Sequence, residues 1–437
     1  MASEIQSAQN SHMFESPAYD SRFDIFSLPK VDTATASEKV IEFHPTTAIR
    51  DGAPIDITIL GMHDLYLDFS RSTLRLSFEI VRRDGTVVDE SDKVSVANLA
   101  LASLIRQCDI YVGYQIMSSD VSQNYYYKSL IDSLVRNSAS YLKSFGPSML
   151  FFKDSAGQID NISLSEDGLN LGQVERFKVT SQGLVTLEGP LFADLWEMQQ
   201  YLPSGVRVDL KLHPQNARFS LMTNSLAQNY DIKIRDCSFL GQFVQPTDAV
   251  AVQHLKMLQK RTALFSLPRS VVKSFPIPGK LREWSIDNVY SSQIPYEIYI
   301  CFVQSDAYHG DVTLSPANLR HYDLESITFS LETQEQISYN PNFAERKYNR
   351  EYLDLVRNNI NTTSIDYTDY DGGYTIFRLQ VKPDVRRAFN LSTIKSQTRL
   401  KVRFRNELPH NVTAIIYGRY HTTFSLDASR NVYLNMF

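Results

Sequence analysis

Three aspartates in a short segment that ends in glycine are the clearest candidates for metal chemistry in this chain. Asp366, Asp369 and Asp371 precede Gly372 and Gly373, and closely spaced carboxylates before a glycine are typical of calcium-binding loops. Their spacing fits such a loop poorly, and no glutamate follows at the distance where a bidentate ligand is needed. We therefore expect a turn before the next strand, and no metal site.

The other motifs that would indicate catalysis are absent from the sequence. It contains no phosphate-binding glycine loop, dinucleotide-binding motif, nucleophile elbow or zinc-protease motif, and none of its nine histidines pairs with another at ligand spacing. Cys108, Cys237 and Cys301 are an odd number at wide spacing, which indicates buried free thiols rather than disulfides or a zinc site. Trp196 and Trp284 are expected to be core or interface aromatics. We predict that the protein is not an enzyme and holds no cofactor.

Basic residues are unevenly distributed, although the net charge of -5 argues against a dedicated nucleic-acid binder. Residues 249–282 hold seven Lys or Arg and no acid, and residues 385–406 again hold seven and none. In the second group, four cations alternate with apolar residues and would form a row on one face of a strand: Arg399, Lys401, Arg403 and Arg405. Such a row needs acids on a neighbouring strand or subunit, which is the favoured interpretation, or a polyanionic partner such as packaged nucleic acid.

The elements that must position these residues are predominantly strands. In residues 74–80 (LRLSFEI) every second side chain is apolar, and residues 206–212 (VRVDLKL) repeat the pattern. Because a strand turns successive side chains to opposite faces, this alternation predicts one buried face and one solvated face. Further strands are expected at residues 294–302, 374–381, 400–404 and 412–420.

Helical periodicity is scarce by comparison. The best stretches are residues 125–136 and residues 248–262, each with apolar residues on one face. Both are short, so we expect loop excursions or connectors rather than a helical layer. The sequence therefore predicts an all-β protein.

The strand patterns fall into two successive stretches of about 200 residues, each about enough for a β-sandwich. A chain of 437 residues also exceeds what one core usually supports. Residues 1–45 are polar and rich in serine, and we expect a partly disordered N-terminal arm that orders against a partner. Residues 46–247 would form the first sandwich, and residues 248–437 a connector helix and the second sandwich.

The N-terminal ten residues are polar, and the longest apolar run, residues 96–105, is too short to cross a bilayer. These features predict synthesis in the cytosol, without a signal peptide or a membrane span. Four N-glycosylation sequons would matter only in a secreted chain: Asn161, Asn361, Asn390 and Asn411.

Several segments resemble, in order, the double jelly-roll major capsid proteins of the Polinton or Maverick and adintovirus type. The resemblance spans roughly residues 55–432, and its strength lies in ordered agreement across both halves rather than in one motif. In the first half, the matching segments are 98–109 (NLALASLIRQCD), 127–140 (YKSLIDSLVRNSAS), 151–157 (FFKDSAG), 189–195 (GPLFADL) and 201–206 (YLPSGV). In the second half, they are 272–279 (VKSFPIPG), 302–310 (FVQSDAYHG), 407–417 (ELPHNVTAIIY) and 427–432 (DASRNV).

This resemblance implies two tandem jelly-roll β-sandwiches in each chain. Three chains would form a pseudo-hexagonal capsomer that tiles an icosahedral shell around a DNA genome, so the expected location is the virion capsid. The implied partners are other copies of the chain, a penton or minor capsid protein, and packaged DNA bound without sequence preference. The N-terminal arm would be a candidate tie to neighbouring or inner proteins.

Two further expectations concern the surface of such a capsomer. The long connections at residues 137–173 and 330–365 would be towers and clasps between subunits, because they are long and weakly periodic. The strand that carries Arg399, Lys401, Arg403 and Arg405 would lie on the inner face or between subunits.

Rival interpretations differ in class. A minor, vertex-forming capsid protein usually needs only one roll. A secreted or host-derived glycan-binding sandwich fits the sequons but lacks the expected leader and disulfides. A cupin-type enzyme would need clustered histidine and carboxylate ligands, which the sequence does not show. A domesticated host copy, or a shell that packages protein cargo, would share all these features.

Overall fold

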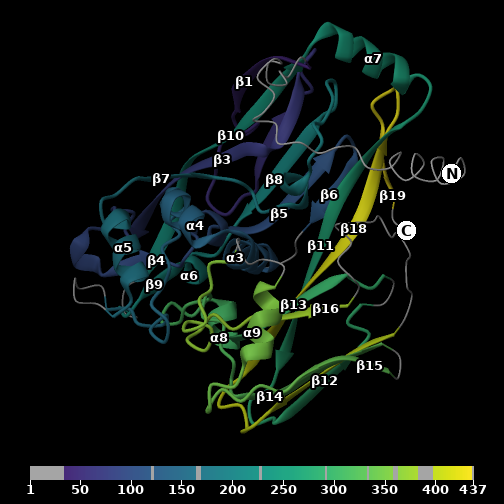
Figure 1. Ribbon diagram of the computed structural model, residues 1–437. Coiled ribbons are helices and arrows are strands. Elements are labelled where there is room, and N and C mark those ends of the chain that lie inside the picture. The colour runs from purple at the N-terminus through teal and green to yellow at the C-terminus, as the bar shows by residue number, and fades with distance from the viewer. Residues whose placement is uncertain are drawn as a thin grey trace, which may run out of the picture.

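The computed structural model describes residues 34–119, 123–163, 169–225, 229–290, 293–331, 334–357, 363–381 and 397–435. Its strands form two successive jelly rolls (Figure 1). The first half contains β1 (Thr35–Phe43), β2 (Ile55–Ile59), β3 (Tyr66–Arg82), β4 (Val94–Val96), β5 (Ile105–Val112), β6 (Gln115–Ser119), β7 (Val185–Gly189), β8 (Val208–Pro214), β9 (Leu221–Thr223) and β10 (Tyr230–Pro246). The second half contains β11 (Ala263–Ile277), β12 (Glu283–Asp287), β13 (Glu297–Gln304), β14 (Leu324–Leu331), β15 (Gln334–Tyr339), β16 (Phe377–Gln380), β17 (Thr398–Phe404), β18 (Val412–Leu426) and β19 (Val432–Asn435).

Helices and short 3₁₀ turns occupy the connections between the strands. They are η2 (Glu90–Asp92), α2 (Ala100–Ser103), α3 (Asn124–Arg136), α4 (Ala139–Phe145), η3 (Gly146–Met149), α5 (Leu171–Thr180), η4 (Asp194–Glu197), α6 (Ala217–Ser220), α7 (Asp248–Leu258), α8 (Ser305–His309) and α9 (Asn349–Val356).

The two halves have the same sheet topology. The first half pairs its strands in the orders β1-β10-β3-β7 and β2-β8-β5-β6. Setting aside the small β4-β9 sheet, these are the orders 1-8-3-6 and 2-7-4-5 along the chain. The second half repeats both orders, as β11-β18-β13-β16 and β12-β17-β14-β15, and β19 adds to β18. Two four-stranded antiparallel sheets connected in this way make a jelly roll. The predicted tandem jelly-roll fold is therefore confirmed.

Each predicted strand coincides with an observed one, although β3 and β18 extend several residues beyond the predicted bounds. Residues 74–80 lie inside β3, and the other five stretches overlap β8, β13, β16, β17 and β18. Alternation was informative because each of these strands has a buried face; β17, for example, alternates strictly between buried and exposed side chains.

The two long connections contain regular elements that their weak periodicity did not indicate. Residues 330–365 contain β15 and α9, and residues 137–173 contain α4, η3 and the start of α5. The sequence of β15, QEQISY, has only one aliphatic residue, so its hydrophobic pattern was too weak to predict a strand.

Residues 1–45 were expected to form an arm, and the structure describes this segment from Ala34 onwards. Residues 35–43 form β1, the edge strand of the first roll, which pairs with β10 from Thr35 opposite Pro246 to Phe43 opposite Phe239. Most of its side chains are exposed. The sequence of β1 is therefore largely polar, although its backbone forms the edge of a sheet. Residues 1–33 lie outside the described residues.

Helix α3 lies in the connection between β6 and β7, as expected of a loop helix, but it is buried on all sides. Every residue from Tyr125 to Val135 is buried, including Lys128 and Asp132. The helix lies against β5 of the first roll and β11 of the second. The apolar residues of both rolls form one contiguous core around it. A helix with charged residues on its second face can be buried only if those charges are paired, and this pairing is described below.

Helix α7 connects the two rolls at one end of the molecule (Figure 1). It begins two residues after β10 ends, where the sequence places the boundary between the halves. None of its residues is buried. The connections that contain α3, α5, α8 and α9 lie away from α7 (Figure 1).

Candidate assembly surfaces and the junction of the two rolls

The junction between the rolls contains a buried ion pair. Lys128 of α3 places its Nζ 2.6 Å from Oδ1 of Asp194, which lies in η4. The other carboxylate oxygen accepts a hydrogen bond from the backbone N–H of Ser270 in β11, at 3.0 Å, and the Ser270 hydroxyl also donates to this carboxylate. Asp194 therefore joins a helix of the first half to a strand of the second.

A second set of charges extends this junction. Glu197 of η4 accepts from Arg136 of α3, and its Oε2 lies 2.5 Å from Nη2 of Arg419 in β18. The other Arg419 nitrogen, Nη1, lies 3.8 Å from Oε2 of Glu297, which also pairs with Arg378. Each carboxylate of this network thus lies between two guanidinium groups.

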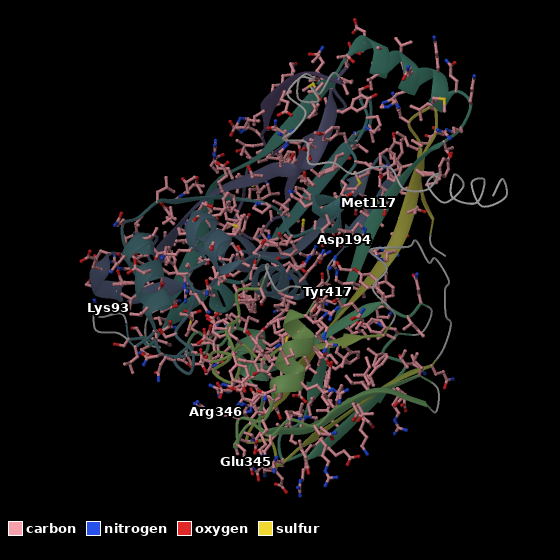
Figure 2. All side chains as sticks on the ribbon, in the orientation of Figure 1. Lys93, Met117, Asp194, Glu345, Arg346 and Tyr417 are labelled. Atoms are coloured by element: carbon pink, nitrogen blue, oxygen red, sulfur yellow. The ribbon has the colours of Figure 1, made fainter. Side chains whose placement is uncertain are left out.

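The charges in this network and their burial shift the pKa values of its carboxyl groups. Burial alone would raise the pKa of Glu197, but Arg419 and Arg136 outweigh it and lower that pKa to about 2. Burial raises the pKa of Asp132, which accepts a hydrogen bond from the Tyr417 hydroxyl at 3.0 Å. Figure 2 shows Asp194 and Tyr417 near the middle of the molecule, where the two halves meet.

The network holds the two rolls in one fixed relation. Removing one partner from a buried ion pair leaves a charge without compensation, at a cost of about 3–5 kcal/mol, so a relative shift of the rolls is strongly disfavoured. Aromatic contacts support the same junction, for example Tyr127 of α3 stacked on Tyr308 of α8 at 5.6 Å between ring centroids. The two rolls therefore share one packed junction.

The four predicted cations do form a row on the exposed face of β17 and just beyond it, and each is paired. Acids of β12 pair with Arg399 and Lys401, at 3.2 Å to Asp287 and 2.8 Å to Glu283. Acids beside and within β14 pair with the other two: Arg403 lies 3.0 Å from Glu325, and Arg405 lies 3.6 Å from Asp323. The row is locally neutral because its acids come from neighbouring strands of the same sheet. Arg386, Arg387 and Lys395, the rest of the basic cluster, lie outside the described residues.

The three candidate calcium ligands lie in a turn, as expected. A lysine ammonium already lies between two of them: Lys153 Nζ is 3.0 Å from Oδ2 of Asp366 and 2.7 Å from Oδ2 of Asp369. Asp371 is 3.8 Å from Nε of Arg346. Within the described residues, no group of three or more His, Cys, Asp or Glu side chains is arranged to hold a metal ion.

The cysteines and tryptophans lie where the sequence indicated. Cys108, Cys237 and Cys301 are buried free thiols, and burial raises the pKa of Cys237 to about 12. Trp196 is buried and donates from its indole nitrogen to the Ser72 carbonyl at 2.8 Å. Trp284 packs on Phe275, with 6.3 Å between ring centroids. No described helix combines the length and apolar character needed to span a bilayer.

Exposed apolar side chains gather at the end of the molecule that carries α7. We call this surface the connector end; it comprises Tyr201, Val252, Leu255, Met257 and Leu264. These side chains are 40–62% exposed. Such a grouping is characteristic of a surface that another polypeptide covers.

The opposite part of the second roll is polar at its edge. Figure 2 shows Glu345 and Arg346 at the outer margin of the molecule, far from the junction. Beneath them, Phe343 and Tyr348 are buried and stack on each other with 5.3 Å between ring centroids. This connection is therefore a packed structure with an exposed polar rim.

Sequence reasoning missed the junction network, although a signal was present. Lys128, Asp132 and Arg136 recur every four residues in an otherwise apolar helical stretch, so they share one helical stripe. A charged stripe opposite an apolar face is usually solvated, and only the position of α3 between the two rolls makes it a buried contact.

Comparisons with known proteins agree with the observed fold. No protein-family model matches the chain. An uncharacterized protein of Caenorhabditis elegans is 23% identical over 430 residues, which cover 92% of this chain and 98% of that protein. A chain of the Sputnik virophage superposes with a TM-score of 0.66 at 10% identity, over 97% of this chain and 93% of the other.

Two viral capsid proteins give further matches. The Faustovirus major capsid protein has a TM-score of 0.59 at 8% identity, covering 96% of each chain. The mavirus major capsid protein has a TM-score of 0.57 at 8% identity, covering 97% of this chain and 95% of the other. This chain therefore has the double jelly-roll fold of viral major capsid proteins.

Proposed function

We propose that this protein is a major capsid protein whose three copies form a pseudo-hexagonal capsomer. The observation that carries the proposal is the repetition of one sheet topology in two rolls that share one contiguous core. Three-fold closed symmetry would place six similar rolls around one axis, so three chains would fill a six-fold position in a surface lattice. The fold shared with the Faustovirus and mavirus major capsid proteins supports this assignment.

The residues agree with a protein that works by shape and interface. The aspartate cluster singled out from the sequence is paired with Lys153 and Arg346 of the same chain, and the buried charges at the junction are paired with each other. We infer that capsomers tile an icosahedral shell around a DNA genome together with a penton or minor capsid protein. The Polinton, Maverick and adintovirus type is part of this proposal and rests on the sequence resemblance.

Light scattering on the purified chain, with negative-stain electron microscopy of the same fractions, tests the proposal. We expect a mass of three times 50.0 kDa with hexagonal outlines, or larger shells. A stable monomer over a wide range of concentration and salt would contradict self-assembly of the chain alone, and a glycan-binding screen would then test the rival class. A shell without nucleic acid would support the capsid function and reject the DNA cargo.

We also propose that the connection between β15 and α9 is a clasp between subunits. Deleting residues 340–349 is a poor test, because this removes the buried Phe343 and Tyr348 and would unfold the region. A double charge reversal, Arg346→Glu with Lys347→Glu, changes only the exposed rim, where these side chains are 79% and 73% exposed. We expect the monomer fraction to rise several-fold while the melting temperature stays constant. An unchanged proportion of trimer would contradict the proposed clasp.

A further inference from the structure

A groove beneath α7 is open at the connector end. Its volume is about 510 Å³, and its lining includes Tyr66, Tyr201, His254, Met257, Leu258 and Leu264. Within this lining, the Tyr66 hydroxyl lies 3.1 Å from Nδ1 of His254 and their rings stack. Leu264 and Tyr201 at its rim are 62% and 42% exposed. The groove is large enough for several apolar side chains.

The described chain starts at the N-terminal end of α7, the helix that covers this groove. The backbone N–H of Thr247, the residue before α7, donates to the carbonyl oxygen of Ala34 at 2.8 Å. Residues 1–33, which precede Ala34, contain one compact apolar segment at residues 23–28 (FDIFSL). The described chain therefore begins at the first turn of the helix that covers the groove.

The length of the connecting chain fits the distance to the groove. Helix α7 has 11 residues, which corresponds to about 16 Å at 1.5 Å per residue. Met257 and Leu258, which line the groove, are in its last turn. The six Cα–Cα steps from Ala34 to Leu28 span at most about 20 Å when extended, at roughly 3.3 Å per step. A chain that runs back along α7 from Ala34 would thus bring Leu28 to the groove.

Charge complementarity favours the same contact. Residues 1–33 hold five Asp or Glu and two Lys or Arg. Residues 248–262, which include all of α7, hold three Lys or Arg and one acid, Asp248. Lys256, Lys260 and Arg261 lie at or just after the C-terminal end of α7, where Arg261 also lines the groove. The net negative charge of residues 1–33 is attracted to them over about one Debye length, roughly 8–10 Å at physiological ionic strength.

We propose that residues 23–28 dock in the groove beneath α7 of the same chain, with Phe26 and Leu28 as the main apolar anchors. This contact covers the connector end of the individual subunit. It does not depend on the proposed capsid function, because groove and segment belong to one polypeptide.

A disulfide-trapping experiment on the full chain tests the proposal. Leu28→Cys is combined with Met257→Cys and the protein is oxidised; the three native cysteines are buried and do not compete. We expect an intramolecular cross-link, seen as a monomer of altered mobility on a non-reducing gel and assigned by peptide mapping. A cross-linked species at twice 50.0 kDa would overturn the assignment to the same chain. Absence of any cross-link would overturn docking.

Two control pairs calibrate this result. Val40→Cys with Gln242→Cys joins positions that lie opposite each other in β1 and β10, so this pair should cross-link. Leu28→Cys with Glu345→Cys joins the segment to the far margin of the second roll (Figure 2), and should not.

A second measurement does not need a cross-link. When Phe23, Ile25, Phe26 and Leu28 are all replaced by serine, the alkylation rate of Met257→Cys should rise several-fold, because the segment no longer covers the groove. The alkylation rate of Glu345→Cys should stay constant in the same background. Equal rates at Met257→Cys with and without the serine substitutions would reject the proposal.

Discussion

The ammonium of Lys128 and the carboxylate of Asp194 form an ion pair of 2.6 Å whose side chains are 1% and 3% exposed. Both residues belong to the first half, and Asp194 also accepts a hydrogen bond from Ser270 of β11, which connects the ion pair to the second roll. We expect Asp194→Ala to destabilise the protein by about 3–5 kcal/mol, since it leaves a buried ammonium without this carboxylate. The lowered melting temperature can be measured by calorimetry or by circular dichroism.

A matched surface pair gives the control for this variant. Lys178 and Glu175 of α5 are 2.8 Å apart and about half exposed, so Glu175→Ala should cost only about 0–1 kcal/mol. The double variant Lys128→Met with Asp194→Leu should recover part of the lost stability, because it removes both buried charges. Equal effects of Asp194→Ala and Glu175→Ala would contradict the importance of the junction.

The thiols provide an independent probe of folding. Cys108, Cys237 and Cys301 are each 0% exposed, and burial raises the pKa of Cys237 to about 12 and that of Cys301 further still. Only the thiolate is reactive, so we expect negligible reaction with a thiol reagent at pH 8 in the folded protein. All three should react after denaturation. Rapid reaction of any one in the native state would show local opening of its roll.

The sequence predicts the fold well because jelly-roll strands are amphipathic. Strands such as β17 alternate strictly, so their pattern alone identifies them. The edge strands β1 and β15 are weaker, since an edge strand is held by backbone hydrogen bonds and needs few apolar side chains. The pairing of strands between distant segments, such as β1 with β10, is a property of the folded chain that alternation does not specify.

The candidate surfaces were predicted less completely. The spacing of Arg399, Lys401, Arg403 and Arg405 was enough to predict the row, because the four residues lie on or next to one strand. The acids that pair with it come from β12 and from the segment around β14, which are more than 70 residues away. The junction network has the same character: its carboxylates and guanidiniums come from several distant elements, so no local pattern contains it.

The pairing of the basic row leads to a prediction about nucleic acid. Lys401→Gln with Arg403→Gln removes two cations that Glu283 and Glu325 already neutralise. We therefore expect little change in DNA affinity, measured by fluorescence anisotropy at low and physiological salt.

The converse variant makes the comparison decisive. Glu283→Gln with Glu325→Gln leaves the cations in place and removes their acids, so DNA affinity at low salt should increase several-fold and fall again as salt is added. A clear loss of DNA affinity in the Lys401 and Arg403 variant would instead place this row against packaged nucleic acid.

Lowering the pH should weaken the junction because Glu197 becomes protonated. Its pKa lies at about 2 in the folded protein, against an ordinary value of 4.5, because the attraction of Arg419 and Arg136 exceeds the effect of burial. A lowered pKa means that the folded state binds the proton less tightly than the unfolded state. The stabilisation is therefore fully present above pH 5 and is lost as the pH falls from about 5 towards 2, and it amounts to about 3 kcal/mol.

Two substitutions separate this effect from general acid denaturation. Glu197→Gln should be less stable than the natural protein at pH 7 by about 3 kcal/mol and should lose less stability between pH 5 and pH 3. Asp132 has a raised pKa because it is buried, so its protonation opposes the loss as the pH falls. Asp132→Asn should therefore show a steeper decline in melting temperature over the same interval. If Glu197→Gln and the natural protein decline in parallel, another carboxylate governs the acid sensitivity.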